Sequence, residues 1–308
     1  MWISSPAEIR QYVSYIVRMS YFEIALLALI QGAAELLPVS SSAHVILAAR
    51  LLGRDPSSPE MVFLLVMLHT GTMFAVLFYF WPRWRKLLSA QVPEGGKRWH
   101  FPLMVVVATA VTGVIGLALM FLIEKVIFVQ LLHHEKGEVE ALFKNMPLIA
   151  AALLAVGILI IVAGRREQRA ESPTITPRSA LWIGLIQGLC LPFRGFSRSG
   201  ATISTALLRG ISRPLAEDFS FALAVVLTPP VILRSLLKLL KAKDWTGIGE
   251  LSDLLLPGLV GMVFSFLAGL VALRFLSAML ERGRWRFFGY YCIAAAAVVA
   301  AAAAVLVP

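Results

Sequence analysis

Two short stretches of this chain carry hydroxyl and charged side chains inside strongly apolar surroundings. They cover residues 29–44 and 185–203, and each begins with Leu-Ile-Gln-Gly and continues into a serine cluster. In a bilayer, ionisable groups and helix breaks are costly and persist mainly where they line a site or cavity. The two stretches therefore predict two halves of one active site.

The first stretch contains the parts of a nucleophilic or metal-assisted reaction. Glu35 lies four residues after Gln31, so on a helix both side chains project from one face and can bind one metal ion or one polar group. Ser41 and His44 lie three residues apart, and a serine near an imidazole supplies a nucleophile and its base. The alternative is that Glu35 only caps a helix or neutralises a neighbouring arginine.

The serine cluster Ser40, Ser41 and Ser42 follows Pro38, where a second half-helix is expected to begin. A helix start presents unpaired backbone N–H groups and a partial positive charge, which suits phosphate. Serines at such a position are also ordinary N-caps. The nearby imidazole of His44 favours the phosphate-binding interpretation, because it can exchange a proton near neutral pH.

The second stretch supplies the positive charge that the first lacks. Arg198 offers a fixed fork of donors for phosphate oxygens, and Gly200 allows a close backbone approach. We expect the neighbouring hydroxyl groups to contact phosphate or to support the groups that do, and these are Ser197, Ser199 and Thr202. The two stretches together predict a phosphate site.

The elements that carry these residues are predicted to be membrane helices. Hydrophobic residues make up 59% of the 308 residues and charged residues 15%, with a mean hydropathy of +0.81, which is far from the soluble average. The net charge of +10 comes largely from short loops, a pattern typical of cytoplasmic loops near anionic headgroups and not of nucleic-acid binding. We expect no cleavable signal peptide.

An all-α polytopic membrane fold follows from the apolar runs. Regions 21–53 and 179–211 are interrupted by proline, serine and glycine, so each half is too short to cross a bilayer and each region is predicted to be a re-entrant helix–turn–helix hairpin. A span needs roughly 20 apolar residues. Six stretches reach this length, near residues 60–82, 100–124, 146–164, 215–238, 255–278 and 287–307.

The basic loops predict the orientation. With six spans, four of these loops fall on one side, which is therefore expected to be cytoplasmic. Three lysines fall on the other side and oppose this assignment, namely Lys238, Lys241 and Lys243. The four agreeing loops are residues 83–98, 165–178, 209–213 and 282–286.

The same span count predicts an inverted repeat within one membrane domain, residues 1–308. Repeat one covers residues 20–164, a cytoplasmic linker covers 165–178, and repeat two covers 179–308 with the opposite orientation. Repeats of this kind place a binding site where their two broken elements meet.

The two stretches also resemble those of a known family. Gln31–His44 resembles the pattern acidic residue-x-x-x-Glu followed by Pro-Val-Ser-Ser-Thr-Gly-His, and Gly195–Ile203 resembles Pro-Gly-x-Ser-Arg-Ser-Gly-Ala-Thr. Both patterns are those of bacterial undecaprenyl-pyrophosphate phosphatases of the bacitracin-resistance type. Likeness extends to residues 68–72, 210–221 and 284–291 and so covers nearly the whole chain.

The resemblance implies hydrolysis of the terminal phosphate of undecaprenyl pyrophosphate, which yields the monophosphate lipid carrier that cell-wall synthesis reuses. It implies a divalent cation, Mg²⁺ or Ca²⁺, as cofactor. It also implies a multi-pass protein of the bacterial plasma membrane, with its site facing the outside. The partners are then the bilayer and the polyprenyl pyrophosphate lipid, with no nucleic acid, and a homodimer is left open.

The resemblance also assigns roles by position. Ser41 would be the nucleophile, His44 the acid or base, and Arg198 the phosphate clamp. Glu35 would be a metal-binding or proton-handling carboxylate. The substrate-contacting residues would be Gln31, Ser40, Ser42, Ser197, Ser199, Gly200 and Thr202.

A second hypothesis belongs to a different class of protein. Inverted repeats with broken helices also characterise secondary transporters, so the chain could flip a polyprenyl phosphate without hydrolysing it. Two departures from the family pattern bear on this: Gln31 replaces an acidic residue, and Phe193 and Arg194 are inserted before Gly195. The pair Ser41 and His44 favours the phosphatase, because a carrier needs neither a nucleophile nor a base.

Overall fold

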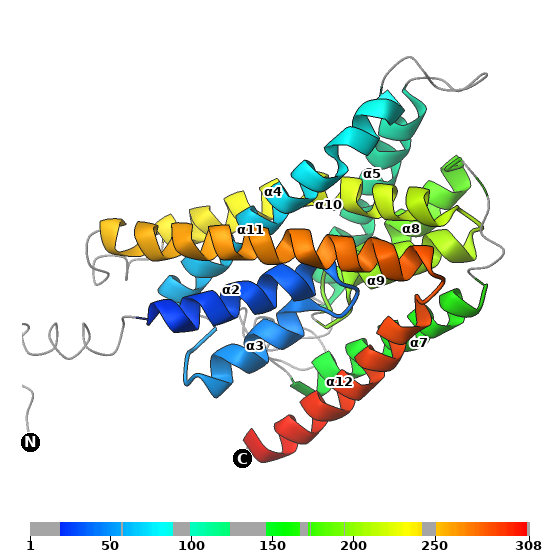
Figure 1. Cartoon of the computed structure of the whole chain (residues 1–308). Helices are drawn as coiled ribbons and strands as arrows, with labels where there is room; N and C mark the ends of the chain where they lie inside the picture. Colours follow the sequence, from blue (N-terminus) through cyan, green and yellow to red (C-terminus); the bar gives the residue numbers. More distant parts are fainter. Residues whose placement is uncertain are drawn as a thin grey trace, which may run out of the picture.

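Long helices dominate the part of the chain that the computed structural model describes. This part comprises residues 19–56, 58–88, 99–123, 146–166, 172, 174–193, 195–241 and 251–306. Six helices are long and apolar enough to cross a membrane by length and composition (Figure 1), which confirms the predicted all-α, multi-pass architecture. They are α4 (Pro59–Leu88), α5 (His100–Phe121), α7 (Met146–Arg166), α10 (Arg213–Lys241), α11 (Leu251–Glu281) and α12 (Arg286–Leu306).

Two pairs of short helices stand where the hairpins are predicted. They are α2 (Tyr21–Leu36) with α3 (Ser41–Leu51), and α8 (Pro177–Cys190) with α9 (Arg198–Leu208). Each first helix begins with a side-chain cap, from Ser20 on α2 and from Thr176 on α8, which satisfies one of the N–H groups left unpaired at a helix start. At about 1.5 Å per residue none of the four is long enough to span alone, which is consistent with re-entrant hairpins.

The two halves of the chain have the same order of elements and pack into each other. In the described residues, each half has two short helices followed by three long ones. A Cβ atom on Gly32 of α2 would lie 2.6 Å from the Ser265 carbonyl oxygen of α11, and one on Gly188 of α8 would lie 2.8 Å from Cβ of Ile115 on α5. The glycine of each Leu-Ile-Gln-Gly segment therefore lets a short helix pack closely against a long helix of the other half.

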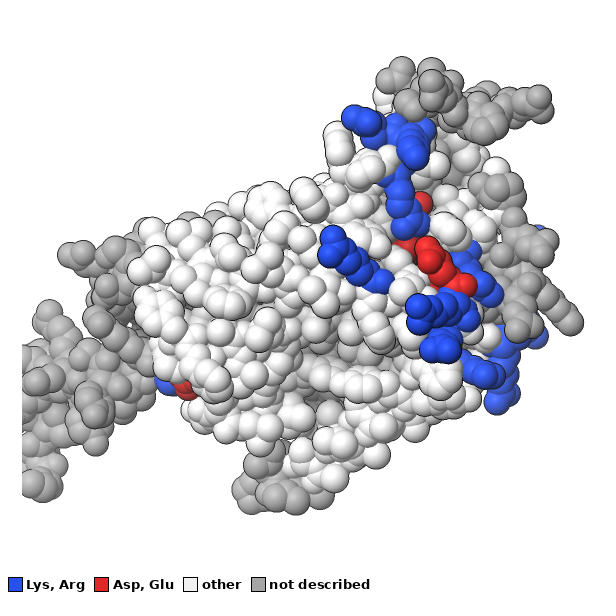
Figure 2. Space-filling model, viewed as in Figure 1, with Lys and Arg blue, Asp and Glu red and all other residues white. Residues whose placement is uncertain are grey.

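Basic residues gather at one end of the bundle. Figure 2 shows blue side chains concentrated at the end where α4, α7 and α11 finish and where α10 and α12 begin (Figures 1 and 2). The last turn of α4 contributes Arg85 and Lys86, and the last turn of α7 contributes Arg165 and Arg166. This end is called the basic end below. Arg194, Lys243 and the side chains of Lys238 and Lys241 lie outside the described residues.

Candidate active site

The tips of the two hairpins meet inside the bundle. The hydroxyl of Ser199, at the start of α9, donates to the carbonyl oxygen of Leu37 at 3.2 Å. A Cβ atom on Gly200 would lie 3.3 Å from both Cβ and the carbonyl oxygen of Pro38, so this glycine allows the close approach that was predicted. The two stretches that look alike in the sequence thus lie in contact.

Glu35 stands at the centre of this contact. Its Oε2 accepts a hydrogen bond from the Ser41 hydroxyl at 2.5 Å, and its Oε1 lies 3.5 Å from Nη2 of Arg198. The side chains of Glu35 and Arg198 are each 20% exposed. A hydroxyl, a carboxylate and a guanidinium from three different helices are therefore brought together, as the sequence predicted for the two halves of one site.

One guanidinium nitrogen of Arg198 is not used in these contacts. Nη1 is buried and has no hydrogen-bond partner among the described residues. A buried cationic donor without an acceptor is costly, and a phosphate oxygen would satisfy it with a charge-assisted bond. Arg198 and Glu35 also line one small cavity, together with Thr72 and Thr228.

A histidine that the sequence analysis did not select completes the cluster. Nδ1 of His69, on α4, lies 3.0 Å from Nε2 of Gln31 and 3.8 Å from Oε2 of Glu35. Gln31 Nε2 also donates to Glu35 Oε2 at 3.3 Å. The available signal was an imidazole inside a strongly apolar run, a position that is rarely without function.

The matching glutamine of the second half has a different environment. Gln187 is fully buried and donates to the Thr112 hydroxyl of α5 at 2.9 Å. The repeated Leu-Ile-Gln-Gly segment therefore serves packing in both halves, but only Gln31 of the first half contacts Glu35.

The start of α3 has an unusual backbone. Ser40 has a φ of 67° and is the one non-glycine residue with positive φ in the described parts of the chain. No side chain caps α3, and Ser40 Oγ instead lies 3.3 Å from Ser42 Oγ. Strained residues of this kind cluster at ligand sites, and an uncapped helix start is suited to an anion.

His44 has partners other than Ser41. Its Nδ1 lies 2.7 Å from the Ser40 carbonyl oxygen, and its Nε2 lies 2.7 Å from the hydroxyl of Tyr291 on α12. The two rings stack at 12° with centroids 5.7 Å apart. Ser41 bonds to Glu35 instead, so the acid or base role of His44 stays a prediction, and Tyr291 is a neighbour that the sequence did not single out.

The hydroxyl groups of the second hairpin mainly hold its structure. Ser197 Oγ accepts from the Gly200 N–H at 3.3 Å and so caps α9. Thr202 is fully buried, donates to the Arg198 carbonyl oxygen at 2.8 Å and lies 2.6 Å from the Ser220 hydroxyl. These contacts fix the helix turn that carries Arg198, and phosphate contacts from Ser197, Ser199 and Thr202 stay predictions.

The side chains of the site fit a divalent cation only if the substrate supplies part of the coordination. Among the described residues no three His, Cys, Asp or Glu side chains form a cluster that could hold a metal. Glu35 is the carboxylate of the site, with the Ser41 hydroxyl oxygen beside it, whereas Gln31 turns its amide nitrogen toward Glu35. Mg²⁺ is commonly held by one or two carboxylates together with substrate phosphates, so the residues fit a cation that is shared with a diphosphate.

Comparisons with known proteins point to one family. Residues 24–298 match the family model described as "Bacitracin resistance protein BacA". The chain is 57% identical over 280 residues to "Undecaprenyl-diphosphatase 2" of Acinetobacter baylyi, which covers 90% of this chain and 95% of the relative. It is 33% identical over 286 residues to "Undecaprenyl-diphosphatase 2" of Burkholderia ambifaria and to "Undecaprenyl-diphosphatase 1" of Burkholderia pseudomallei, in both cases covering 89% of this chain and 94% of the relative.

Proposed function

This chain belongs to the bacitracin resistance protein BacA family, and we propose that it is a membrane phosphatase that converts undecaprenyl pyrophosphate into undecaprenyl phosphate and inorganic phosphate. The observation that carries the proposal is the contact of Ser41, Glu35 and Arg198 where the two hairpins meet. A phosphatase needs a nucleophile, a proton acceptor and a group that binds phosphate. Ser41, Glu35 and Arg198 can supply these in that order. The relatives named as diphosphatases support the same activity.

The proposed first step is attack of Ser41 on the terminal phosphorus. Glu35 accepts the hydroxyl proton while Oγ forms a bond to phosphorus, and the bond from phosphorus to the bridging oxygen breaks. Undecaprenyl phosphate leaves with that oxygen. Arg198 and the uncapped start of α3 hold the phosphoryl oxygens as charge develops on them. Water then attacks the phosphoserine and gives a proton to the His44 imidazole. The bond from phosphorus to Oγ breaks, Ser41 recovers its proton from Glu35, and inorganic phosphate is released.

His44 is proposed as the acid or base that serves the leaving oxygen or the incoming water. For this role its Nε2 must exchange the contact with Tyr291 for substrate or water. Gln31, Ser40 and Ser42 are proposed to contact the diphosphate around the same point.

We propose Mg²⁺ or Ca²⁺ as the cofactor, which Glu35 would hold together with the diphosphate. Such a cation would offset phosphate charge in a site that has one arginine at its centre. His69 and Gln31 would orient the Glu35 carboxylate beside it.

The location proposed for the site is the outer side of the bacterial plasma membrane. The first hairpin carries Ser41 and Glu35, and it begins at Tyr21, near the ion pair of Glu23 and Arg54. If the basic end is cytoplasmic, as positive charge in short loops indicates, the first hairpin enters from the outside. A homodimer remains a prediction.

The decisive test is release of inorganic phosphate from undecaprenyl pyrophosphate by the purified full-length protein. The proposal expects release by the wild type and loss by about 10²-fold or more in Ser41→Ala and Arg198→Ala, as for removal of a nucleophile or of an electrostatic clamp. Binding of the lipid by Ser41→Ala should persist. Binding without any release by the wild type would instead favour the transporter hypothesis, which the names of the relatives do not support.

A further inference from the structure

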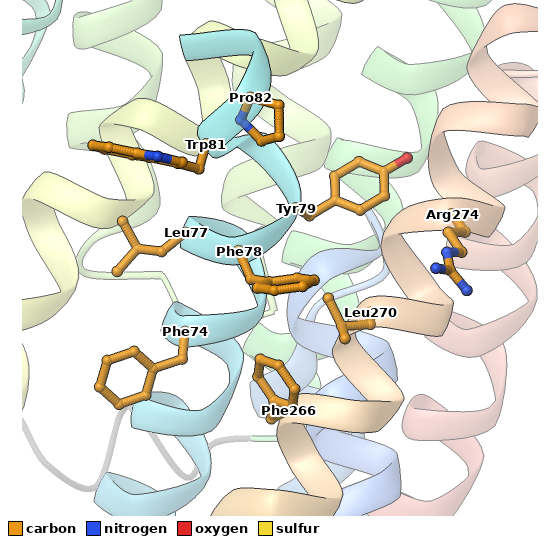
Figure 3. Close-up of a pocket in the computed structure, with 9 residues that line it drawn as sticks. All are labelled: Phe74, Leu77, Phe78, Tyr79, Trp81, Pro82, Phe266, Leu270 and Arg274. Atoms are coloured by element: carbon orange, nitrogen blue, oxygen red, sulfur yellow. The ribbon is translucent and has the colours of Figure 1, made fainter. Parts of the chain in front are cut away.

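A large apolar groove lies on the outside of the bundle, between α4 and α11. Its volume is about 860 Å³. Figure 3 shows aromatic side chains of α4 and α11 along it, with Phe74 and Phe266 at one end and Arg274 nearer the other. Phe78 and Trp81 are 69% and 54% exposed. The groove shares no lining residue with the cavity of Glu35 and Arg198, so it is separate from the active site.

Arg274 is the feature of this groove that needs an explanation. It is exposed on α11, within the segment Leu255–Glu281 that is long and apolar enough to span a membrane. It lies seven residues before the end of α11, about 10 Å along the helix axis. An arginine at this depth on a lipid-facing surface is costly unless an anion or an extended side-chain conformation compensates it.

The described residues do not provide that anion. In the described parts of the chain, Arg274 makes no ion pair or hydrogen bond with a protein group. Glu217 already accepts bonds from Arg83 at 3.0 Å and from Ser277. The hydroxyl of Tyr79, which lines the groove beside Arg274, donates to Ser277 at 3.0 Å. The neighbouring polar groups are therefore paired among themselves.

The groove is oriented as a membrane lipid would be, with its charged group toward the basic end and its apolar part toward the middle of the bundle. The basic end of the bundle lies toward Pro82 of α4 and Glu281 of α11, since both helices finish there. From Arg274 the groove runs past Leu270 to Phe266, toward the middle of the two helices. A cation close to the basic end, with an apolar path leading inward from it, matches a phosphate headgroup with an acyl chain beneath it.

We propose that this groove binds an anionic glycerophospholipid of the leaflet at the basic end. Its phosphodiester pairs with Arg274, and one acyl chain lies against Phe78, Leu270 and Phe266. The lipid thereby joins α11 to α4, the helix that carries His69. This site does not depend on the proposed hydrolytic activity, because Arg274 lies outside the active-site cluster.

The test compares lipid binding by full-length variants in detergent. Phosphatidylglycerol and phosphatidylcholine are titrated into the wild type, Arg274→Gln and the control Arg284→Gln, which removes an exposed charge from the same end. Lipid retention by native mass spectrometry and the rise in unfolding temperature are measured. We expect Arg274→Gln to weaken phosphatidylglycerol binding by about tenfold or more, the effect of one lost charge-assisted contact. Arg284→Gln should bind like the wild type.

Two further arms identify the occupant. Leu270→Trp fills the chain path without touching the charge, so it should also weaken phosphatidylglycerol binding. Undecaprenyl phosphate is titrated as the competing source of a lipid phosphate. Equal binding of phosphatidylcholine, full phosphatidylglycerol binding by Arg274→Gln, or Arg274-dependent binding of undecaprenyl phosphate alone would each overturn the proposal. Phosphate release in detergent without added lipid should be unchanged in Arg274→Gln, which separates this result from any failure of the proposed function.

Discussion

Glu35→Gln is the substitution that most directly tests the chemistry of the site. Glutamine keeps the shape of the side chain, and its carbonyl oxygen can still accept the Ser41 hydrogen bond of 2.5 Å. The substitution removes two properties: the ability to accept the Ser41 proton, and the negative charge that lies 3.5 Å from Arg198. The substitution therefore separates proton transfer from geometry.

The expected size of the effect follows from these contacts. A positioned base contributes about 10²- to 10⁴-fold, so kcat should fall by that factor, or roughly 3–5 kcal/mol of barrier. KM should rise, because Glu35 is the carboxylate proposed to hold the cation together with the diphosphate. An unchanged KM would mean that binding depends mainly on Arg198.

The assay is steady-state phosphate release at saturating and at low substrate, with Glu23→Gln as the control. Glu23 lies on the same helix about three turns earlier and pairs with Arg54. It contacts none of the active-site groups, so its loss should change kcat by about twofold or less. A kcat of Glu35→Gln within tenfold of the wild type would refute the role of Glu35 as the base.

Three other outcomes are expected. Gly32→Ala should lower the unfolding temperature, since its Cβ would lie 2.6 Å from the Ser265 carbonyl oxygen and overpacking costs about 1–3 kcal/mol. The control Gly113→Ala should leave the unfolding temperature unchanged, because nothing lies within 4 Å of its Cβ. An equal fall in unfolding temperature in both variants would contradict the packing argument. Burial of Glu23 opposes its ionisation, but bonds from a backbone N–H and from Arg54 outweigh this and lower its pKa. Its contribution to stability is therefore present above about pH 4.5 and is lost as the pH falls through the lowered pKa, so unfolding scans should show acidification narrowing the difference between wild type and Glu23→Gln. Chelation should abolish phosphate release and Mg²⁺ or Ca²⁺ should restore it, whereas full activity in chelator would remove the cation from the proposal.

The spans and the two helix breaks could be predicted because hydropathy and proline act locally. The prediction for the first span ended at residue 82, but α4 continues through Pro82 to Leu88. Likewise α10 contains Pro229 and Pro230. Neighbouring helices can satisfy the backbone groups that a membrane proline leaves unpaired, and that compensation is not visible in a local pattern.

The sequence predicted which residues form the site better than it predicted which of them contact each other. Glu35, Ser41 and Arg198 were selected because charge and hydroxyl groups stand out in an apolar sequence. The partner of Ser41 depends on how α3 is turned relative to α2, and the positive φ of Ser40 sets that turn. His69 and Tyr291 reach the site from α4 and α12, and such distant contacts follow only from the tertiary fold.

The interlocked halves also constrain the order in which the protein can mature. Gly32 packs on Ser265, which is 233 residues later in the chain. The first hairpin therefore cannot complete its packing until most of the protein has been synthesised and inserted. Until α9 and α11 are inserted, Glu35 lacks Arg198 and Gly32 lacks its packing partner, and contacts this distant form slowly. A truncated or stalled chain would thus leave a polar, half-built hairpin in the membrane, which is a recognisable substrate for the proteases and chaperones that remove misassembled membrane proteins.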